Sequence, residues 1–236
     1  MHFSPPFIRA VLLRRYQRFL ADVEGPDTGR MTVHCPNTGS MLGCADPGMP
    51  VWLSRATNPS RKYAWTWELV EALPGVRVGI HTGRTNGLVR EAVESGIVAE
   101  LLGYTSIQAE VRAGDGFRVD FLLRGHGQDP DCFLEAKNVT AAVHDGIAMF
   151  PDAVSERASR HMRELMQKVA AGHRAMLFFC VQRDDVREVR PADAIDPEYG
   201  RTLRLALRSG VEVCAYAARV NPDEIRLYRS VPVNTL

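Results

Sequence analysis

The sequence predicts a mixed α/β protein in which a small N-terminal β-barrel precedes a larger domain with a mixed central sheet. Residues 1–81 contain short β-prone runs separated by turn-forming segments such as GPDTG and NPSRK, a pattern typical of a small barrel. Residues 82–236 instead alternate segments of helical and of strand character, an order that produces an α/β domain. The chain of 236 residues is long enough for two such domains.

The first domain, residues 1–81, is predicted to contain five strands. They cover residues 8–13, 16–23, 31–35, 51–56 and 76–81. This set of short strands fits an OB-like barrel, a fold that often binds nucleic acid through a basic groove and stacked aromatic side chains. All three tryptophans lie in this domain, and we expect most of its aromatic rings to be core residues.

Charge is unevenly distributed between the two domains. Residues 1–81 carry 9 Lys and Arg against 6 Asp and Glu, whereas residues 82–236 carry 20 against 22. A local basic patch in the first domain can engage phosphate groups. Its candidate nucleic-acid-binding residues are Arg14, Arg15, Arg18, Arg61 and Lys62. An ordinary solvated surface has the same composition, so the charge distribution leaves both interpretations open.

The second domain, residues 82–236, is predicted to follow the order helix, three strands, helix, strand, helix, strand. The first helix carries an apolar stripe from Leu88 to Leu101 and is closed by Gly103. Residues 144–153 are expected to form a loop that leads into a helix ending near residue 171. Strands are expected at residues 106–111, 117–123, 132–139, 175–181, 211–217 and 225–228, and a last helix at residues 198–209.

Two of these strands carry the residues with the clearest chemistry. In the strand at 117–123 the odd-numbered residues are apolar and should share one face, with Asp120 on the other. In the next strand Glu135 and Lys137 point the same way, about 7 Å apart. If the two strands pair as a hairpin, Asp120 lies beside them. Two carboxylates suit Mg²⁺ or Mn²⁺, and a neighbouring lysine can hold an attacking water.

The alternative interpretation of this triplet is an exposed strand edge with solvated charges. The lysine content favours the metal site, because the chain has only three lysines, Lys62, Lys137 and Lys168, against 26 arginines. Charges inside otherwise apolar strands are also costly unless they are paired or bind a metal.

Further features concern binding and location. In the helix predicted after residue 153, Arg157 and His161 lie one turn apart and are candidate phosphate contacts, although a solvated helix face is the commoner explanation.

The five cysteines are scattered and odd in number, which favours a reducing cytoplasm. No apolar run approaches the ~18 residues of a membrane span, so no membrane partner is expected.

The spacing of Asp120, Glu135 and Lys137, D-x14-E-x-K, resembles that of the PD-(D/E)xK nuclease superfamily, with Val119 in place of the proline. Longer segments, among them HCPNTGSMLGC, RKYAWTWELV, CFLEAKNVT and FPDAVSERASRHMREL, resemble the sugar fermentation stimulation protein (SfsA) family over nearly the full chain. This resemblance implies an OB-like domain followed by a PD-(D/E)xK nuclease-like domain. It also implies non-specific DNA binding and a regulatory link to sugar metabolism, particularly that of maltose.

Carried over by motif, the resemblance implies that Asp120 and Glu135 are catalytic metal carboxylates and that Lys137 is the catalytic lysine. The superfamily also has a glutamate on the helix before the hairpin. Glu91 is the first choice for this third metal ligand and Glu100 is the second.

Two functions follow on the same fold. The first is a non-specific DNA-binding protein that regulates sugar metabolism and keeps a nuclease-like metal site. The alternative is an active Mg²⁺-dependent nuclease that cleaves phosphodiester bonds of DNA or RNA. A sugar-binding or interaction module is a third hypothesis, but nothing in the sequence points to a sugar site. Many proteins of this fold pair their sites, so a homodimer is compatible with the sequence.

Overall fold

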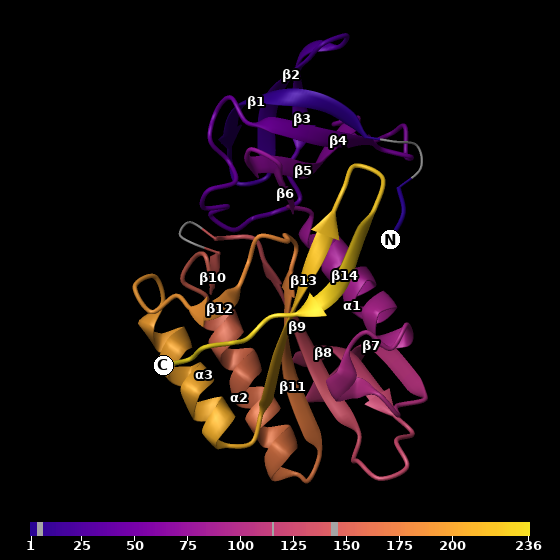
Figure 1. Ribbon diagram of the computed structural model, residues 1–236, viewed down its shortest axis with the longest axis vertical. Coiled ribbons are helices and arrows are strands. Elements are labelled where there is room, and N and C mark those ends of the chain that lie inside the picture. Colours follow the sequence, from indigo (N-terminus) through magenta and orange to yellow (C-terminus); the bar gives the residue numbers. More distant parts are fainter. Residues whose placement is uncertain (4–6, 115, 143–145) are drawn as a thin grey trace.

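The computed structural model describes residues 1–3, 7–114, 116–142 and 146–236. Within these ranges the chain forms a barrel and, below it in Figure 1, a domain built on a mixed sheet. A hairpin of the second domain rises beside the barrel, so that the two parts are in direct contact (Figure 1).

The first sheet is a closed barrel with one additional strand. Its strands are β1 (Ile8–Tyr16), β2 (Leu20–Gly25), β3 (Gly29–His34), β4 (Pro50–Arg55), β5 (Trp65–Leu73) and β6 (Val76–Gly79). They are joined in the order β3-β2-β1-β4-β5-β6. Pairing of His34 in β3 with Thr66 in β5 closes the first five strands into a barrel. The predicted OB-like barrel is therefore confirmed.

Strand β5 is not among the strands that the sequence predicts. It contains five consecutive buried residues, from Thr66 to Val70, with the charged Glu68 in their middle. Because both faces of the strand are covered, its residues do not alternate between apolar and polar, and the glutamate interrupts the apolar run. Trp67 on this strand is fully buried in the barrel core, as expected for most of the aromatic residues.

The second domain is built on a six-stranded mixed sheet. Its elements are η1 (Thr82–Arg84), α1 (Thr85–Glu94), η2 (Ala99–Leu101), β7 (Ser106–Gly114), β8 (Phe117–Arg124), β9 (Cys132–Val139), β10 (Ile147–Phe150), α2 (Glu156–Ala170), β11 (Arg174–Val181), β12 (Glu188–Pro191), α3 (Pro197–Arg208), β13 (Glu212–Val220) and β14 (Ile225–Ser230). The strand order is β14-β13-β11-β9-β8-β7. Strands β9, β11 and β13 are parallel and the other pairs are antiparallel, which confirms the predicted mixed sheet.

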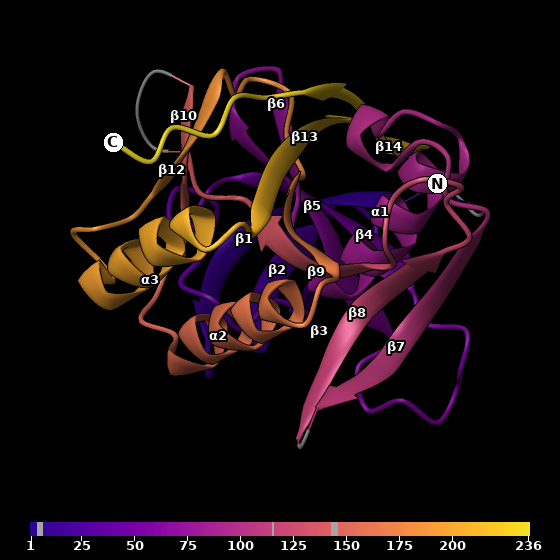
Figure 2. The same cartoon turned by 90° about the horizontal axis from the view of Figure 1, so that it is seen from below.

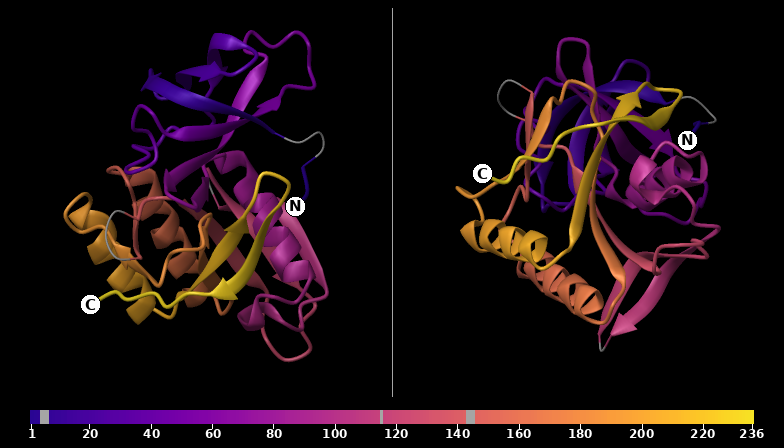
Figure 3. Two further views of the ribbon diagram at one scale, coloured as in Figure 1. Left: turned by 45° about the horizontal axis from the view of Figure 1, so that its top comes forward. Right: turned by 60° about the horizontal axis from the view of Figure 1, so that its bottom comes forward.

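Helices cover both faces of this sheet. Helices α2 and α3 lie on one face and α1 lies on the other, as Figures 2 and 3 show from two sides. Each face has its own apolar core, one around Met162 and Leu165 of α2 and one around Leu88 and Val89 of α1. The side chain of Ser155 caps the start of α2 by accepting a hydrogen bond from the backbone of Ala158.

Two predicted elements of the second domain differ from the structure. The first helix ends at Glu94 instead of continuing to Leu101, because Gly96 adopts a φ of 72° and turns the chain. The expected loop at 144–153 contains strand β10, which pairs in parallel with β12; residues 144 and 145 of that loop lie outside the described residues. A four-residue strand that pairs only with another short strand has too little periodicity to be seen in the sequence.

All five cysteines are free thiols and are buried. Burial raises the pKa of Cys44 to about 11 and the pKa values of Cys132 and Cys180 to about 12. The pKa of Cys35 and that of Cys214 are raised by burial as well. In the ranges that the structure describes, no helix is both long enough and apolar enough to cross a membrane.

A buried ion cluster ties the barrel to the start of the second domain. Glu68 of β5 accepts two hydrogen bonds of 2.7 Å from Arg84 and one of 2.6 Å from Ser54. The Nδ1 atom of His81 lies 2.9 Å from the same carboxylate. Burial alone would raise the pKa of Glu68, but the bonds from Arg84 and His81 outweigh burial and lower the pKa from 4.5 to about 2.

We predict that Glu68→Gln lowers the free energy of unfolding at neutral pH by roughly 3 kcal/mol, because a fall in pKa from 4.5 to about 2 corresponds to that energy. A lowered pKa stabilises the folded state above the unfolded pKa, and this stabilisation is lost as the pH falls from 4.5 towards 2. Urea unfolding of wild type and variant between pH 7 and pH 3 should therefore give a difference that shrinks below pH 4.5. A difference that is constant over this range would contradict the assignment.

Candidate metal centre

The site lies where strands β8 and β9 separate. Their antiparallel pairing runs from Leu123 opposite Cys132 to Phe121 opposite Leu134 and then stops. The next two residues in register would be Asp120 and Glu135.

The Asp120 side chain bonds to the backbone of β9 where the backbone pairing of β8 and β9 ends. Its Oδ2 atom accepts a hydrogen bond of 2.8 Å from the backbone N–H of Ala136 on β9. Its Oδ1 atom accepts one of 3.0 Å from the side chain of Asn86 on α1. The carboxylate of Asp120 is thereby fixed between the sheet and the helix.

The odd-numbered side chains of β8 point to one face of the sheet before Asp120 and to the other face after it. Phe117 and Val119 pack in the core under α2, whereas Phe121 and Leu123 pack in the core under α1. The prediction that these four odd-numbered residues share one face is therefore wrong. The break coincides with the end of the β8–β9 pairing, and irregular strand positions of this kind redirect side chains next to active sites.

Glu135 is the centre of a buried polar cluster on the α2 side of β9. Its Oε1 atom accepts a hydrogen bond of 2.7 Å from Lys137 Nζ and also contacts Nδ1 of His161. The Nε atom of Arg157 lies 3.3 Å from the other ring nitrogen of His161, Nε2, and donates to it. Since Nε2 accepts, the ring proton is on Nδ1, and His161 donates it to Glu135.

The two oxygens of Glu135 have very different surroundings. Oε1 has two donors, whereas Oε2 is buried and has no hydrogen-bond partner among the described residues. Burial would raise the pKa of Glu135, but the bond from His161 and the charge of Lys137 lower it. Burial and the charge of Glu135 raise the pKa of Asp120. The cluster therefore combines an ionised Glu135 with an oxygen that faces no donor.

The structure brings Asp120, Glu135 and Lys137 together and gives the other predicted carboxylates different partners. Glu91 accepts a hydrogen bond of 2.9 Å from the amino group of Met1. Glu100 accepts one of 2.6 Å from the hydroxyl of Tyr216. Over residues 1–3, 7–114, 116–142 and 146–236, no group of three or more His, Cys, Asp or Glu side chains is arranged to hold a metal ion.

Two residues near the site carry no signal in the sequence. Asn86 of α1 bridges Asp120 and, at 3.5 Å, the carboxylate of Glu110 on β7. Glu110 is exposed and has a φ of 55°, opposite the break in β8. Asn86 reaches Asp120 through the packing of α1 on the sheet, which the spacing along the chain does not encode, whereas Glu110 lies opposite Asp120 in the β7–β8 hairpin.

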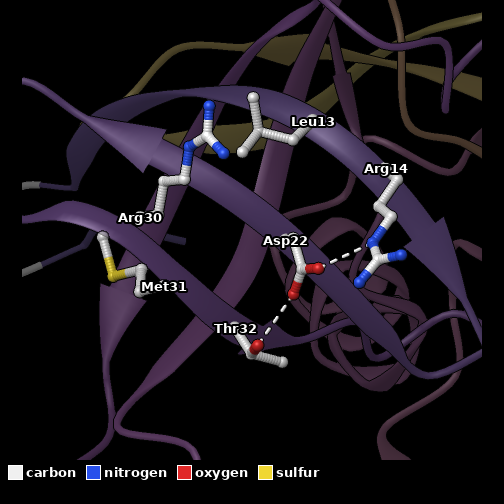
Figure 4. Close-up of a pocket in the computed structure, with 6 residues that line it drawn as sticks. All are labelled: Leu13, Arg14, Asp22, Arg30, Met31 and Thr32. Carbon is white, nitrogen blue, oxygen red and sulfur yellow. Dashed lines mark hydrogen bonds and ion pairs between the residues drawn. The ribbon is translucent and has the colours of Figure 1, made fainter.

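Two arginines of the predicted basic patch, Arg14 and Arg15, are bonded to other groups of the barrel. Arg14 pairs with Asp22 at 2.7 Å, beside a pocket of about 520 Å³ on the β1–β3 surface (Figure 4). Arg15 donates to four backbone carbonyls, those of Arg18, Asn37, Gly39 and Ser40. Arg15 therefore holds together the turn around Asn37 and Ser40.

The remaining predicted contacts differ in exposure. Arg18 and Lys62 are exposed, and Arg61, also exposed, donates to Thr66 at 3.3 Å. His161 is buried with both ring nitrogens in contact with protein, and Arg157 donates to it, so these two residues support Glu135. The alternative explanation for this pair, a solvated helix face, does not hold for His161, which is buried, whereas Arg157 is exposed.

The family model for the "SfsA N-terminal OB domain" matches residues 13–80, and the model for the "Sugar fermentation stimulation protein RE domain" matches residues 83–224. The chain belongs to the sugar fermentation stimulation protein family. The resemblance drawn from the sequence motifs is thereby confirmed.

Relatives within the SfsA family cover almost the whole chain. A sugar fermentation stimulation protein homolog of Thioalkalivibrio sulfidiphilus is 56% identical over 235 residues, covering 99% of this chain and 98% of the relative. A homolog of Geobacter sulfurreducens is 56% identical over 228 residues, covering 97% and 96%. The structure of Pyrococcus furiosus SfsA in complex with Ca²⁺ matches with a TM-score of 0.89 at 26% identity, covering 99% of this chain and 98% of that chain.

We predict that His161→Ala weakens the binding of Ca²⁺ or Mn²⁺ about 10- to 100-fold, as is typical when an outer partner of a metal carboxylate is lost. Without the Nδ1–H donor, the Glu135 carboxylate can rotate and Oε2 is no longer held in place. Isothermal titration calorimetry measures the effect. His173→Ala is the control, because His173 packs on the ring of Phe133 and bonds to none of the cluster residues named above. Equal affinities of the two variants would contradict the role given to His161.

Proposed function

We propose that this protein hydrolyses phosphodiester bonds of nucleic acid at the cluster of Asp120, Glu135 and Lys137, with a bound divalent cation. The proposal rests on the Oε2 atom of Glu135, which is buried and has no donor in the described part of the chain. An ionised oxygen in this position has lost its water without gaining a hydrogen bond, which is unfavourable. A cation at Oε2 would remove that penalty.

The chemistry of the ligands supports a hard divalent cation. The carboxylates of Asp120 and Glu135 offer oxygen atoms, which suit Mg²⁺, Mn²⁺ and Ca²⁺. Both oxygens of Asp120 accept a hydrogen bond, but each keeps a further lone pair for a cation. We extend to this chain the Ca²⁺ binding stated for the Pyrococcus furiosus relative.

The side chains of the cluster then have distinct roles. Bound Mg²⁺ or Mn²⁺ supplies Lewis-acid polarisation of the scissile phosphate. Asp120 and Oε2 of Glu135 would hold the cation, while His161 fixes the orientation of Glu135. Lys137, whose Nζ lies 2.7 Å from Oε1 of Glu135, holds the attacking water and stabilises the negative charge that develops on the phosphate.

DNA binding without cleavage is the second candidate function, in line with a regulatory role in sugar metabolism. The exposed side chains of Arg18, Phe19 and Lys62 on the barrel favour it, because OB-like barrels bind nucleic acid with cations and exposed aromatic rings. In this case the carboxylate cluster would bind a cation that offsets its repulsion of DNA without catalysing hydrolysis.

We predict that wild-type protein cleaves labelled DNA or RNA in the presence of Mg²⁺ or Mn²⁺ and not in EDTA. Asp120→Ala, Glu135→Ala and Lys137→Ala should each lower the rate at least 100-fold, as is typical for the loss of one group that stabilises the transition state. Single- and double-stranded forms of both nucleic acids are tested, and binding is measured in the same samples by fluorescence anisotropy.

Glu94→Gln serves as the control, because Glu94 is an exposed residue of α1 that pairs with Arg90 on the same helix. It should cleave at the wild-type rate. A Lys137→Ala protein as fast as wild type would exclude the proposed chemistry. Binding without cleavage by wild type, unchanged in Asp120→Ala and Glu135→Ala, would instead establish the second candidate.

A further inference from the structure

Two arginines face each other across the β7–β8 hairpin. Arg112 and Arg118 are directly opposite in the antiparallel register. Their neighbours Val111 and Phe117 pack on the core under α2. Since side chains alternate along a strand, the two guanidinium groups lie on the other face of the hairpin, and both are exposed.

Neither arginine has a partner among the residues that the structure describes. Among the described residues, Arg112 and Arg118 take part in no hydrogen bond, ion pair or ring contact. Arg124, further along the same strand, shows the usual arrangement, because it bonds to Asp131 at 3.2 Å and to Gln108 at 3.3 Å. Like charges placed directly opposite each other destabilise a strand pair. The arginine pair therefore has a cost for folding that nothing in the described structure offsets.

The pair is close to the candidate metal centre. Arg118 is two residues from Asp120 on β8, about 7 Å along the strand. On the opposite face of the same strand, the ring of Phe117 packs edge-on against the ring of His161, with the ring centroids 5.1 Å apart. The β7–β8 hairpin projects from the body of the domain (Figure 2), and both arginines on it are exposed. The spacing from Asp120 is close to the separation of neighbouring phosphates along a nucleic-acid strand.

We propose that Arg112 and Arg118 form a phosphate-binding site that holds the backbone of a nucleic-acid strand one nucleotide away from the phosphate at the metal centre. Two guanidinium groups offer planar, bidentate donors that match phosphate oxygens, and one bound phosphate neutralises the repulsion between them. The ligand is the phosphodiester backbone and not a base, because the described residues of the hairpin include no exposed aromatic side chain. The inference rests on the proposed function for its substrate.

The test measures binding of labelled single- and double-stranded oligonucleotides by R112Q/R118Q in EDTA, where no cleavage occurs. Affinity should fall roughly tenfold at 0.1 M salt, without dependence on base sequence. Loss of one neutralised phosphate should also make the dependence of log K on log salt shallower by about 0.7 for single strands and about 0.9 for duplexes. R208Q/R226Q, which removes the same charge from α3 and β14, should keep the wild-type affinity and salt dependence.

A second variant separates binding from folding. R118E places opposite charges across the hairpin, so it should raise the melting temperature while weakening oligonucleotide binding at least as much as R112Q/R118Q. Inorganic pyrophosphate should raise the melting temperature of wild type and not that of R112Q/R118Q. The inference would be overturned if R112Q/R118Q bound oligonucleotides with the affinity and salt dependence of wild type. If pyrophosphate raised the melting temperature of wild type but the two proteins bound oligonucleotides equally, the site would bind free phosphate and not nucleic acid.

The outcomes distinguish this inference from the proposed function. If wild type cleaves and R112Q/R118Q binds and cleaves like wild type, the arginine site is excluded and the hydrolytic function stands. If wild type binds without cleaving and R112Q/R118Q binds more weakly, the hydrolytic function is excluded and the phosphate site stands. If wild type binds no oligonucleotide, both are excluded.

Discussion

The candidate site depends on the point at which β8 and β9 stop pairing. Had the ladder continued past Phe121 and Leu134, the N–H of Ala136 would bond to a strand carbonyl and Asp120 would have no donor from β9. Because the pairing ends there, the carboxylate of Asp120 accepts a hydrogen bond from that N–H and is held beside Glu135. The change of facing along β8 and the positive φ of Glu110 on β7 belong to the same local break.

The two buried glutamates Glu68 and Glu135 differ in how their carboxylate oxygens are hydrogen-bonded. Both oxygens of Glu68 accept hydrogen bonds, from Ser54, Arg84 and His81, and the result is a rigid junction between the domains. In Glu135 both donors contact one oxygen and the other has none in the described structure. A carboxylate with a structural role is saturated by donors, whereas this uneven arrangement suits a ligand that arrives from outside.

The sequence was informative where the site depends on neighbouring strands. Asp120, Glu135 and Lys137 lie on two strands of one hairpin, so their spacing along the chain predicts that they meet, although the predicted alternation of β8 fails at Asp120. Contacts between helix and sheet cannot be predicted in this way. The facing of α1 depends on how the helix is rotated against the sheet, which brings Asn86 and not Glu91 to Asp120.

Other parts of the fold needed the three-dimensional structure for similar reasons. The contact of His161 with Glu135 joins residues 26 positions apart on different elements, and no local pattern marks it. The strand β5 is hidden by burial on both faces. The unpaired state of Arg112 and Arg118 is visible only once their register and surroundings are known.

The buried cysteines have a practical consequence for following this molecule in solution. Thiol reagents attack the thiolate, and burial both shields the five sulfur atoms and raises their pKa values. The native chain should therefore be nearly inert to maleimide dyes under mild conditions. A single cysteine introduced on the exposed hairpin would accept one fluorophore without removal of any native thiol, so the hairpin's movements could be recorded in an otherwise unaltered protein.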